Sequence, residues 1–206
     1  MALLRADRPP PSPGATEDAA ADAAAIALVL AGDTGQFRAV VERHQVRLQR
    51  IIHRLVGHPE DAAELTQQAL LAAFSALGRY DPLSPFSPWL VRIGVNLAKD
   101  HLRSSRRREV LGAADELEQR SAPAQSSPER SLADLESRRS LWIALQTLHI
   151  SDREILVLKD VEELSYEEIR AILGSPITAL KIRALRARQR LRAALARVAP
   201  DERPGP

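Results

Sequence analysis

The stretch SYEEIRAILGSPITALKIRALRARQRLRAALAR, residues 165–197, decides the fold of this chain. It predicts two helices joined by a tight turn. Ser165 can cap the first helix, and Glu168 stands three residues later, where a capping box needs an acid. Gly174 permits a left-handed helix end, and the proline two positions later prevents the first helix from continuing. A second helix is therefore expected to begin near Thr178.

The second helix is basic on two flanks and apolar on one narrow face. Its basic residues are Lys181, Arg183, Arg186, Arg188, Arg190, Arg192 and Arg197, and it contains no acid. At helical spacing, its apolar face consists of Leu180, Ala184, Ala187, Leu191 and Leu195. A short helix, a turn with glycine and a basic helix are typical of a helix-turn-helix, whose second helix enters the DNA major groove. A basic amphipathic helix that only closes a bundle is the alternative interpretation.

Composition favours an all-α protein. Aromatic residues make up only 3% of the chain, and the apolar residues are mostly Ala, Leu, Ile and Val. No apolar run is long enough to span a membrane, the N-terminus lacks a signal-peptide core, and there is no cysteine. The histidines show no metal-ligand spacing, and no nucleophile–base or phosphate-loop pattern occurs. We therefore expect a cytoplasmic protein that has no membrane span of its own, needs no cofactor and is not an enzyme.

Breaks in periodicity and shifts in charge predict two small helical domains joined by a flexible linker. The expected parts are a disordered tail (1–18), a first domain (19–108), a linker (109–127), a second domain with the helix-turn-helix (128–199) and a short tail (200–206). The first domain and the last helix are basic, whereas residues 109–140 are acidic. A polyanion could therefore be bound at two places on either side of the linker.

The helix expected after Pro59 has a second face beside its apolar one. That face carries Asp61, Glu64, Leu65 and Gln68 at intervals of three or four residues. An exposed Leu65 among polar side chains would be typical of a protein-docking surface. A plain solvated face is the alternative.

A loop at residues 79–85 precedes another helix, which Ser87 is expected to cap. Cations and one amide share a stripe of this helix, at Arg92, Asn96, Lys99 and Arg103. Cations can bind phosphates, and an amide can contact a base edge. Tyr80 and Phe86 could offer stacking, which contributes about 1–3 kcal/mol per base. The stripe thus indicates binding of single-stranded or distorted DNA, with a solvated basic face as the alternative.

The order of these parts resembles a bacterial RNA polymerase sigma factor of the extracytoplasmic-function group, over about residues 20–197. Three sets of segments carry the resemblance. The first is DAAELTQQ (61–68), similar to the family's DAEDLVQE. The second is FSPWL (86–90) with IGVNLAKDHLR (93–103), similar to FRTWLYRIARNLALDHLR. The third is REILVL (153–158), LSYEEI (164–169) and RARQRL (186–191), similar to REVLVL, LSYEEIA and RARKRL.

The resemblance implies an alternative sigma factor, which binds core RNA polymerase, directs it to specific promoters and assists promoter melting. The first domain would be sigma region 2, and the second domain would be sigma region 4. The implied partners are the beta-prime clamp and the beta flap of core RNA polymerase, promoter DNA and an anti-sigma factor.

The resemblance also implies three groups of binding residues. Polymerase would be bound by Asp61, Glu64, Leu65, Gln67 and Gln68. The minus-ten promoter element would be bound by Arg79, Tyr80, Phe86, Trp89, Arg92, Asn96, Lys99 and Arg103. The minus-thirty-five element would be bound by Thr178, Ala179, Lys181, Ile182, Arg183, Arg186 and Arg188.

Some positions depart from the family pattern. Ala63 and Gln68 stand where the family has acids, so the polymerase-facing surface is less negative. Ala179 and Ile182 replace residues with hydroxyl groups, which predicts an atypical minus-thirty-five preference or a weaker dependence on that element. Two other functions remain open: a stand-alone helix-turn-helix regulator, and a degenerate sigma-like decoy that binds only a protein partner.

Overall fold

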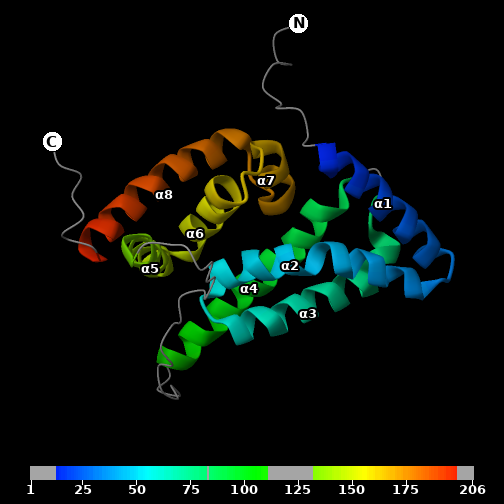
Figure 1. The fold of residues 1–206 in the computed structure, drawn as a ribbon, viewed down its shortest axis with the longest axis horizontal. Helices are drawn as coiled ribbons and strands as arrows, with labels where there is room; N and C mark the ends of the chain where they lie inside the picture. The colour runs from blue at the N-terminus through cyan, green and yellow to red at the C-terminus, as the bar shows by residue number, and fades with distance from the viewer. Residues whose placement is uncertain (1–12, 83, 111–131, 199–206) are drawn as a thin grey trace, which may run out of the picture.

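The computed structural model describes residues 13–82, 84–110 and 132–198, which form two helical domains (Figure 1). The first domain contains α1 (Pro13–Leu30), η1 (Thr34–Gln36), α2 (Phe37–Val56), α3 (Pro59–Ala76), η2 (Leu77–Arg79) and α4 (Phe86–Val110). The second contains α5 (Leu132–Thr147), α6 (Ile150–Leu156), the π-helical turn η3 (Val157–Val161), α7 (Tyr166–Leu173) and α8 (Ile177–Val198). The predicted all-α fold class is confirmed.

The predicted helix-turn-helix is present as α7 and α8. The Ser165 hydroxyl accepts a hydrogen bond from the Glu168 backbone N–H at 3.2 Å. The Glu168 carboxylate accepts one in return from the Ser165 N–H at 2.8 Å, which completes the capping box. Gly174 ends α7 with φ +67°, a conformation that favours glycine. The capping box and the glycine helix end are therefore both present as the sequence predicted.

Two predicted boundaries differ from the structure. Helix α1 begins at Pro13, so residues 13–18 are helical rather than part of a disordered tail. The N-cap of α6 is His149, whose Nδ1 accepts from the Ser151 N–H. Helix α4 continues through Val110 into the start of the predicted linker. Residues 1–12, 111–131 and 199–206 lie outside the described residues, with most of the predicted linker and the last tail among them.

The core of the first domain is formed by α2, α3 and α4. Leu48, Ile51, Ile52 and Leu55 of α2 are almost completely buried. Gly94 lets α4 approach α2 closely, because a Cβ at this position would lie 2.8 Å from a methyl carbon of Leu48. This close contact fixes the position of α4, the helix with the predicted DNA-binding stripe.

The core of the second domain uses the apolar face of α8. Leu180, Ala184 and Ala187 are fully buried, as the spacing predicts. These residues contact a hydrophobic core that includes Ile155 and Leu158, which are also fully buried. The opposite face of α8 is turned outward, at the edge of the molecule (Figure 1).

The two domains are packed against each other. Helix α7 contacts α4, while α6 and η3 contact α2, and the buried apolar residues of both domains form one continuous core. Side chains of the second domain also bind the C-terminal end of α2. The Arg153 guanidinium donates to the Leu55 carbonyl, and Gln146 Nε2 donates to the Arg54 carbonyl at 3.1 Å. The sequence predicted separate domains on a flexible linker. It did not predict that the domains contact each other directly.

None of the helices in the described part of the chain combines the length and apolar character that a membrane crossing requires.

Candidate nucleic-acid and protein interfaces

The first turns of α8 present the predicted minus-thirty-five residues to solvent. Those with exposed side chains are Thr178, Ala179, Lys181, Ile182 and Arg186. Ile182 is 52% exposed, a large value for an apolar side chain. A solvent-facing surface that combines cations with an isoleucine can contact both phosphates and a thymine methyl in a major groove.

Arg183 is on the same helix but faces inward. Its Nε donates to the Ser151 carbonyl at 2.8 Å, and its Nη2 donates to the Glu154 carboxylate. These bonds hold α8 against α6, so Arg183 has a structural position within the second domain. A direct contact of Arg183 with DNA would require breaking them.

Arg188 is paired on the protein surface. Its guanidinium makes a two-pronged contact with Asp160 of η3, with Nε 3.0 Å from the carboxylate. Hydrogen bonding to Asp160 raises the pKa of Arg188 above its ordinary value. Arg188 therefore faces η3 rather than standing alone as a free cation.

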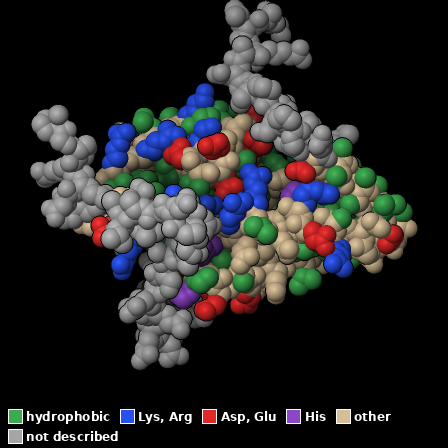
Figure 2. Space-filling view, viewed as in Figure 1, with side chains coloured by type: hydrophobic (Ala, Val, Ile, Leu, Met, Phe, Trp, Pro, Cys, Tyr) green, Lys and Arg blue, Asp and Glu red, His purple; other side chains and the backbone are tan. Residues whose placement is uncertain are grey.

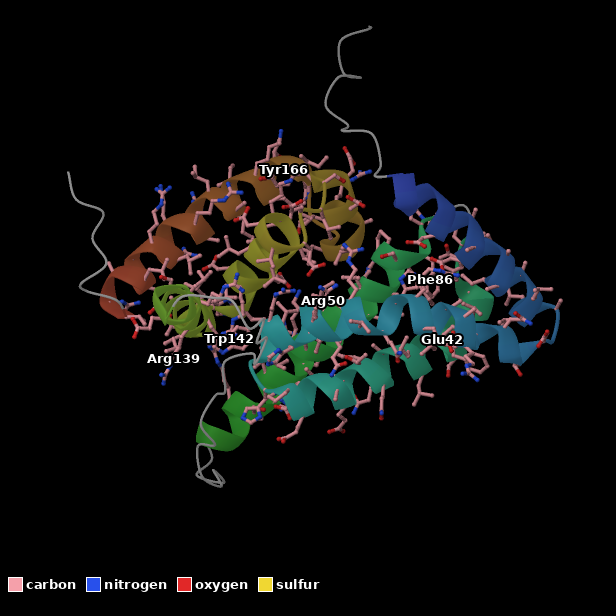
Figure 3. All side chains as sticks on the ribbon, viewed as in Figure 1. Glu42, Arg50, Phe86, Arg139, Trp142 and Tyr166 are labelled. Carbon is pink, nitrogen blue, oxygen red and sulfur yellow. The ribbon has the colours of Figure 1, made fainter. Side chains whose placement is uncertain are left out.

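Tyr80, Phe86 and Trp89 form an aromatic cluster at the start of α4. Their ring centroids are 5.0–5.5 Å apart, and Phe86 (labelled in Figure 3) is only 3% exposed. The Tyr80 hydroxyl donates to the Ser84 carbonyl, and burial is the largest cause that raises the pKa of Tyr80. We expected Tyr80 and Phe86 to be open for base stacking, and this expectation is wrong because the rings pack on one another. The cluster instead shapes the loop before α4.

The predicted basic stripe on α4 is exposed except at one position. Arg92, Asn96 and Arg103 face solvent, as does Arg79 of η2. Lys99 is half-buried, and its Nζ lies 3.0 Å from Glu154 Oε2 of the second domain. One cation of the predicted DNA-binding stripe therefore forms an ion pair with a carboxylate of the second domain.

The polar face of α3 also matches its prediction in part. Glu64, Gln67 and Gln68 are exposed, and Asp61 is partly exposed and pairs with His101 Nε2 at 3.2 Å. This face borders an open groove of about 350 Å³ between α3 and α4. Leu65 is only 6% exposed, so the interpretation in which it is an exposed apolar anchor is wrong. The surface offered to a partner is polar and acidic.

Sequence reasoning missed a group of buried charged residues on α6. Asp152, Arg153 and Glu154 are only 2–5% exposed. Asp152 accepts from Arg190 Nη1 at 2.6 Å, and Arg153 and Glu154 contact the first domain. The apolar run directly after these three residues was a usable signal. Such a run indicates a short helix that is buried on all sides, and a helix of that kind buries its charged residues as well. In the part of the chain that the structure describes, no three His, Asp or Glu side chains are grouped to hold a metal ion.

Both domains match family models. Sigma-70 region 2 matches residues 40–108, and Sigma-70, region 4 matches residues 138–191. The chain is 36% identical over 161 residues to RNA polymerase sigma factor CarQ of Myxococcus xanthus, which covers 78% of this chain and 90% of the relative. It is 30% identical over 164 residues to the ECF RNA polymerase sigma-E factor of Escherichia coli K12, which covers 77% of this chain and 85% of the relative.

Solved structures show the same fold. CnrH, solved in complex with the cytosolic domain of CnrY, has a TM-score of 0.63 and 29% identity, and the match covers 86% of this chain and 98% of CnrH. The sigma factor RpoE of Bartonella quintana, solved with the anti-sigma factor NepR, has a TM-score of 0.60 and 23% identity, with 81% and 98% covered.

The chain therefore belongs to the sigma-70 family of RNA polymerase sigma factors. Within that family it is an alternative sigma factor of the extracytoplasmic-function (ECF) group, as the sequence motifs predicted. Members of this family are transcription initiation factors rather than enzymes.

Proposed function

We propose that the three exposed surfaces have separate binding roles in transcription initiation. The acidic face of α3 binds core RNA polymerase, the stripe on α4 binds the melted minus-ten element, and the first turns of α8 bind the minus-thirty-five element. The observation that carries this proposal is the exposure of polar and basic residues at these three places on one chain, in the order of sigma regions 2 and 4.

The polymerase contact is assigned to Asp61, Glu64, Gln67 and Gln68. The Glu64, Gln67 and Gln68 side chains are exposed and Asp61 is partly exposed, and together they suit a partner surface with arginine or lysine side chains. Since Leu65 is buried, this contact depends on charge and hydrogen bonding more than on an apolar anchor. The matching contact of the second domain with polymerase is assigned to the beta flap, by analogy with the family.

The minus-ten contact is assigned to Arg79, Arg92, Asn96 and Arg103, with Lys99 joining when its pair with Glu154 opens. The exposed Asn96 amide can form two hydrogen bonds to a base edge, and the flanking guanidinium groups can bind the backbone. Binding an unstacked base offsets an opening cost of a few kcal/mol.

The minus-thirty-five contact is assigned to Thr178, Ala179, Lys181, Ile182 and Arg186. Ile182 provides an apolar contact where the family has a hydroxyl, so a thymine methyl is the expected partner. We also propose an anti-sigma factor as a regulatory partner, because the solved RpoE of the same fold was captured with one.

Run-off transcription with purified core RNA polymerase tests the function as a whole. Specific transcripts from genomic DNA that appear only with this protein would support the proposal, and their start sites would define both promoter elements. Polymerase binding without initiation would favour the decoy. Upstream DNA binding with no polymerase binding would favour the stand-alone regulator.

A further inference from the structure

Helix α1 is attached to the first domain through a buried carboxylate. Asp22 is the only charged residue between Ala19 and Ala31 in the sequence, and it is 3% exposed. An aspartate is almost never buried to this extent unless its charge is paired. In Figure 2 the right-hand end of the molecule, where α1 lies, shows mostly hydrophobic side chains and backbone with few charges. The charge of Asp22 therefore serves a contact inside the protein.

Two consecutive residues of α2 bind the two oxygens of this carboxylate. Arg43 Nη1 donates to Asp22 Oδ1, and His44 Nε2 lies 2.7 Å from Asp22 Oδ2. A carboxylate only accepts hydrogen bonds, so the second contact places a proton on Nε2. Together the two contacts fix the rotation of α1 against α2 and the orientation of the His44 ring.

This contact is separate from the boundary between the domains. Further along α2, Arg47 and Arg54 pair with Glu162 of the second domain, at 3.0 and 2.8 Å. The partners of Asp22 both belong to the first domain, so the effect of this carboxylate can be tested apart from the packing of the domains. Helix α1 also lies outside the segment that matches the region 2 family model, which begins at residue 40.

His44 connects the carboxylate to the aromatic cluster at the start of α4. Its ring packs on Phe86 (labelled in Figure 3), with centroids 5.6 Å apart, and both side chains are buried. Phe86 in turn packs on Tyr80 and Trp89. Burial, followed by the charge of Asp22, raises the pKa of Tyr80, which agrees with a carboxylate close to the phenol. A continuous series of contacts therefore leads from α1 to the cluster.

The aromatic cluster closes the turn that leads into α4. The Tyr80 hydroxyl donates to the Ser84 carbonyl, and the Ser84 hydroxyl donates to Asp81 Oδ2 at 3.0 Å. The Ser84 N–H also donates to the Asp81 carbonyl at 3.0 Å. Arg79 precedes this turn, and Asn96 follows it on α4. The turn therefore sets the distance between two parts of the proposed minus-ten surface.

We propose that Asp22 and His44 are positioning residues for recognition of the minus-ten element. Both side chains are buried, so neither meets DNA itself. They hold the ring of Phe86, and through it they hold the turn that places Arg79 beside α4. A buried ionic contact specifies one geometry more than it adds stability, because desolvation offsets much of the attraction. This inference rests on the proposed function for its consequence at DNA, while the positioning of the aromatic cluster is a property of the free chain.

The first measurement follows Trp89 in the free, full-length protein. The chain has two tryptophans, so Trp142→Phe leaves the half-buried Trp89 as the only one, and this variant serves as the parent. Asp22→Ala removes the carboxylate and introduces a residue that favours a helix. We expect this change to loosen the aromatic cluster, which shifts Trp89 emission to longer wavelength and increases its quenching by acrylamide. Emission and quenching equal to those of the parent would overturn the positioning.

The second measurement is base recognition in the complex with core polymerase. One probe is a single-stranded oligonucleotide with the minus-ten sequence mapped by run-off transcription, and the other has the same bases in permuted order. Asp22→Ala should lower the affinity for the first probe by about tenfold, within the range of effects carried through packed side chains. Binding of the permuted probe should not change, because backbone contacts carry no sequence information. A variant that had only lost stability would bind both probes less well.

The two measurements separate the ways in which the inference could fail. If Trp89 responds and the ratio of the two affinities stays at the parent value, the role in recognition is excluded. If the parent itself shows no preference between the probes while Trp89 responds, the proposed minus-ten function fails and the positioning stands.

Three further variants control both measurements. Asp18→Ala makes the same change one turn earlier on α1, at an exposed residue 3.7 Å from Arg43 Nε, and should match the parent. Asp22→Asn keeps an acceptor oxygen and should recover part of the loss. His44→Phe keeps a ring against Phe86 without the bond to Asp22, so it should behave like Asp22→Ala. Because the two residues act in series, the double variant should be no worse than either single one, and additive losses would contradict this connection.

Discussion

Lys99 of α4 and Arg183 of α8 bind opposite oxygens of one buried carboxylate, that of Glu154. Both cations were expected to contact DNA, one at each promoter element. The structure instead joins them inside the protein, whereas Arg92, Arg103, Lys181 and Arg186 on the same helices are exposed. This relationship separates structural cations from those available to DNA.

Replacing Arg183 should destabilise the protein. Arg183→Ala removes one of the two cations paired with Glu154 and the hydrogen bonds to the Ser151 carbonyl, so the free energy of unfolding should fall by about 2 kcal/mol. Urea denaturation followed by circular dichroism measures this loss. Arg183→Lys keeps the charge without the two-pronged geometry and should recover part of it. A normal stability for Arg183→Ala would contradict the structural position.

Replacing Arg186 should instead weaken DNA binding. Arg186 is exposed, so Arg186→Ala should leave the urea midpoint unchanged. Loss of one phosphate contact should reduce the slope of log K against log salt by about one unit on upstream duplex DNA. Fluorescence anisotropy over a range of salt concentrations measures the slope. Equal slopes for the parent and the variant would show that Arg186 is solvated and does not contact a phosphate.

Replacing Asn96 should affect promoter opening alone. Asn96→Ala removes an exposed amide that can bond to a base edge, at an expected cost of about 1–3 kcal/mol in binding the melted strand. Permanganate footprinting measures opening, and a pull-down with core polymerase should be unaffected. Gln45→Ala, which removes an exposed amide from α2, is the matched control. Unchanged opening in Asn96→Ala would exclude the assigned base contact.

A side chain at position 94 should destabilise the protein. The Cβ of Gly94→Ala would lie 2.8 Å from Leu48 Cδ1 and 3.1 Å from Ile52 Cδ1, which predicts a loss of about 1–3 kcal/mol from overpacking. Thermal unfolding measures the loss. Gly78→Ala, where nothing lies within 4 Å of the new Cβ, should melt close to the parent temperature. Equal melting temperatures for the two variants would argue against the close contact of α4 and α2.

His53 should make stability depend on pH. Burial, followed by the charges of Arg54 and His58, lowers the pKa of His53 below its ordinary value of 6.5. As pH falls through 6.5, the unfolded chain takes up this proton before the folded one, so stability is present above that value and is lost below it. Urea denaturation on both sides of this pH, with parent and His53→Leu, measures the effect. The variant should have a flatter profile, and identical profiles would rule out this contribution.

Local features of the fold were predictable because they depend on neighbouring residues. The capping box of Ser165 and Glu168, the glycine end at Gly174 and the apolar face of α8 all follow from spacing within one helix. The exposure of Thr178, Lys181 and Arg186 follows from the same periodicity. The family motifs then identified the surfaces as parts of a sigma factor.

Contacts between distant residues were not predictable in this way. Leu65 lies on a mixed polar face, and periodicity alone could not show that this edge of α3 packs toward α4. Tyr80 and Phe86 were misjudged because aromatic rings in a loop can pack on each other as easily as on a base. The partners of Glu154 and Glu162 lie in another domain, and no local pattern indicates such a pairing.

The end of α2 is completed by residues of another domain, at the carbonyls of Arg54 and Leu55. When Gln146 and Arg153 withdraw, these carbonyls must turn to water, and the last turn of α2 loses its support. Amide hydrogen exchange there should therefore quicken whenever the domains part. This turn leads directly into α3, so the helix that we propose to bind polymerase begins next to the carbonyls that the second domain binds.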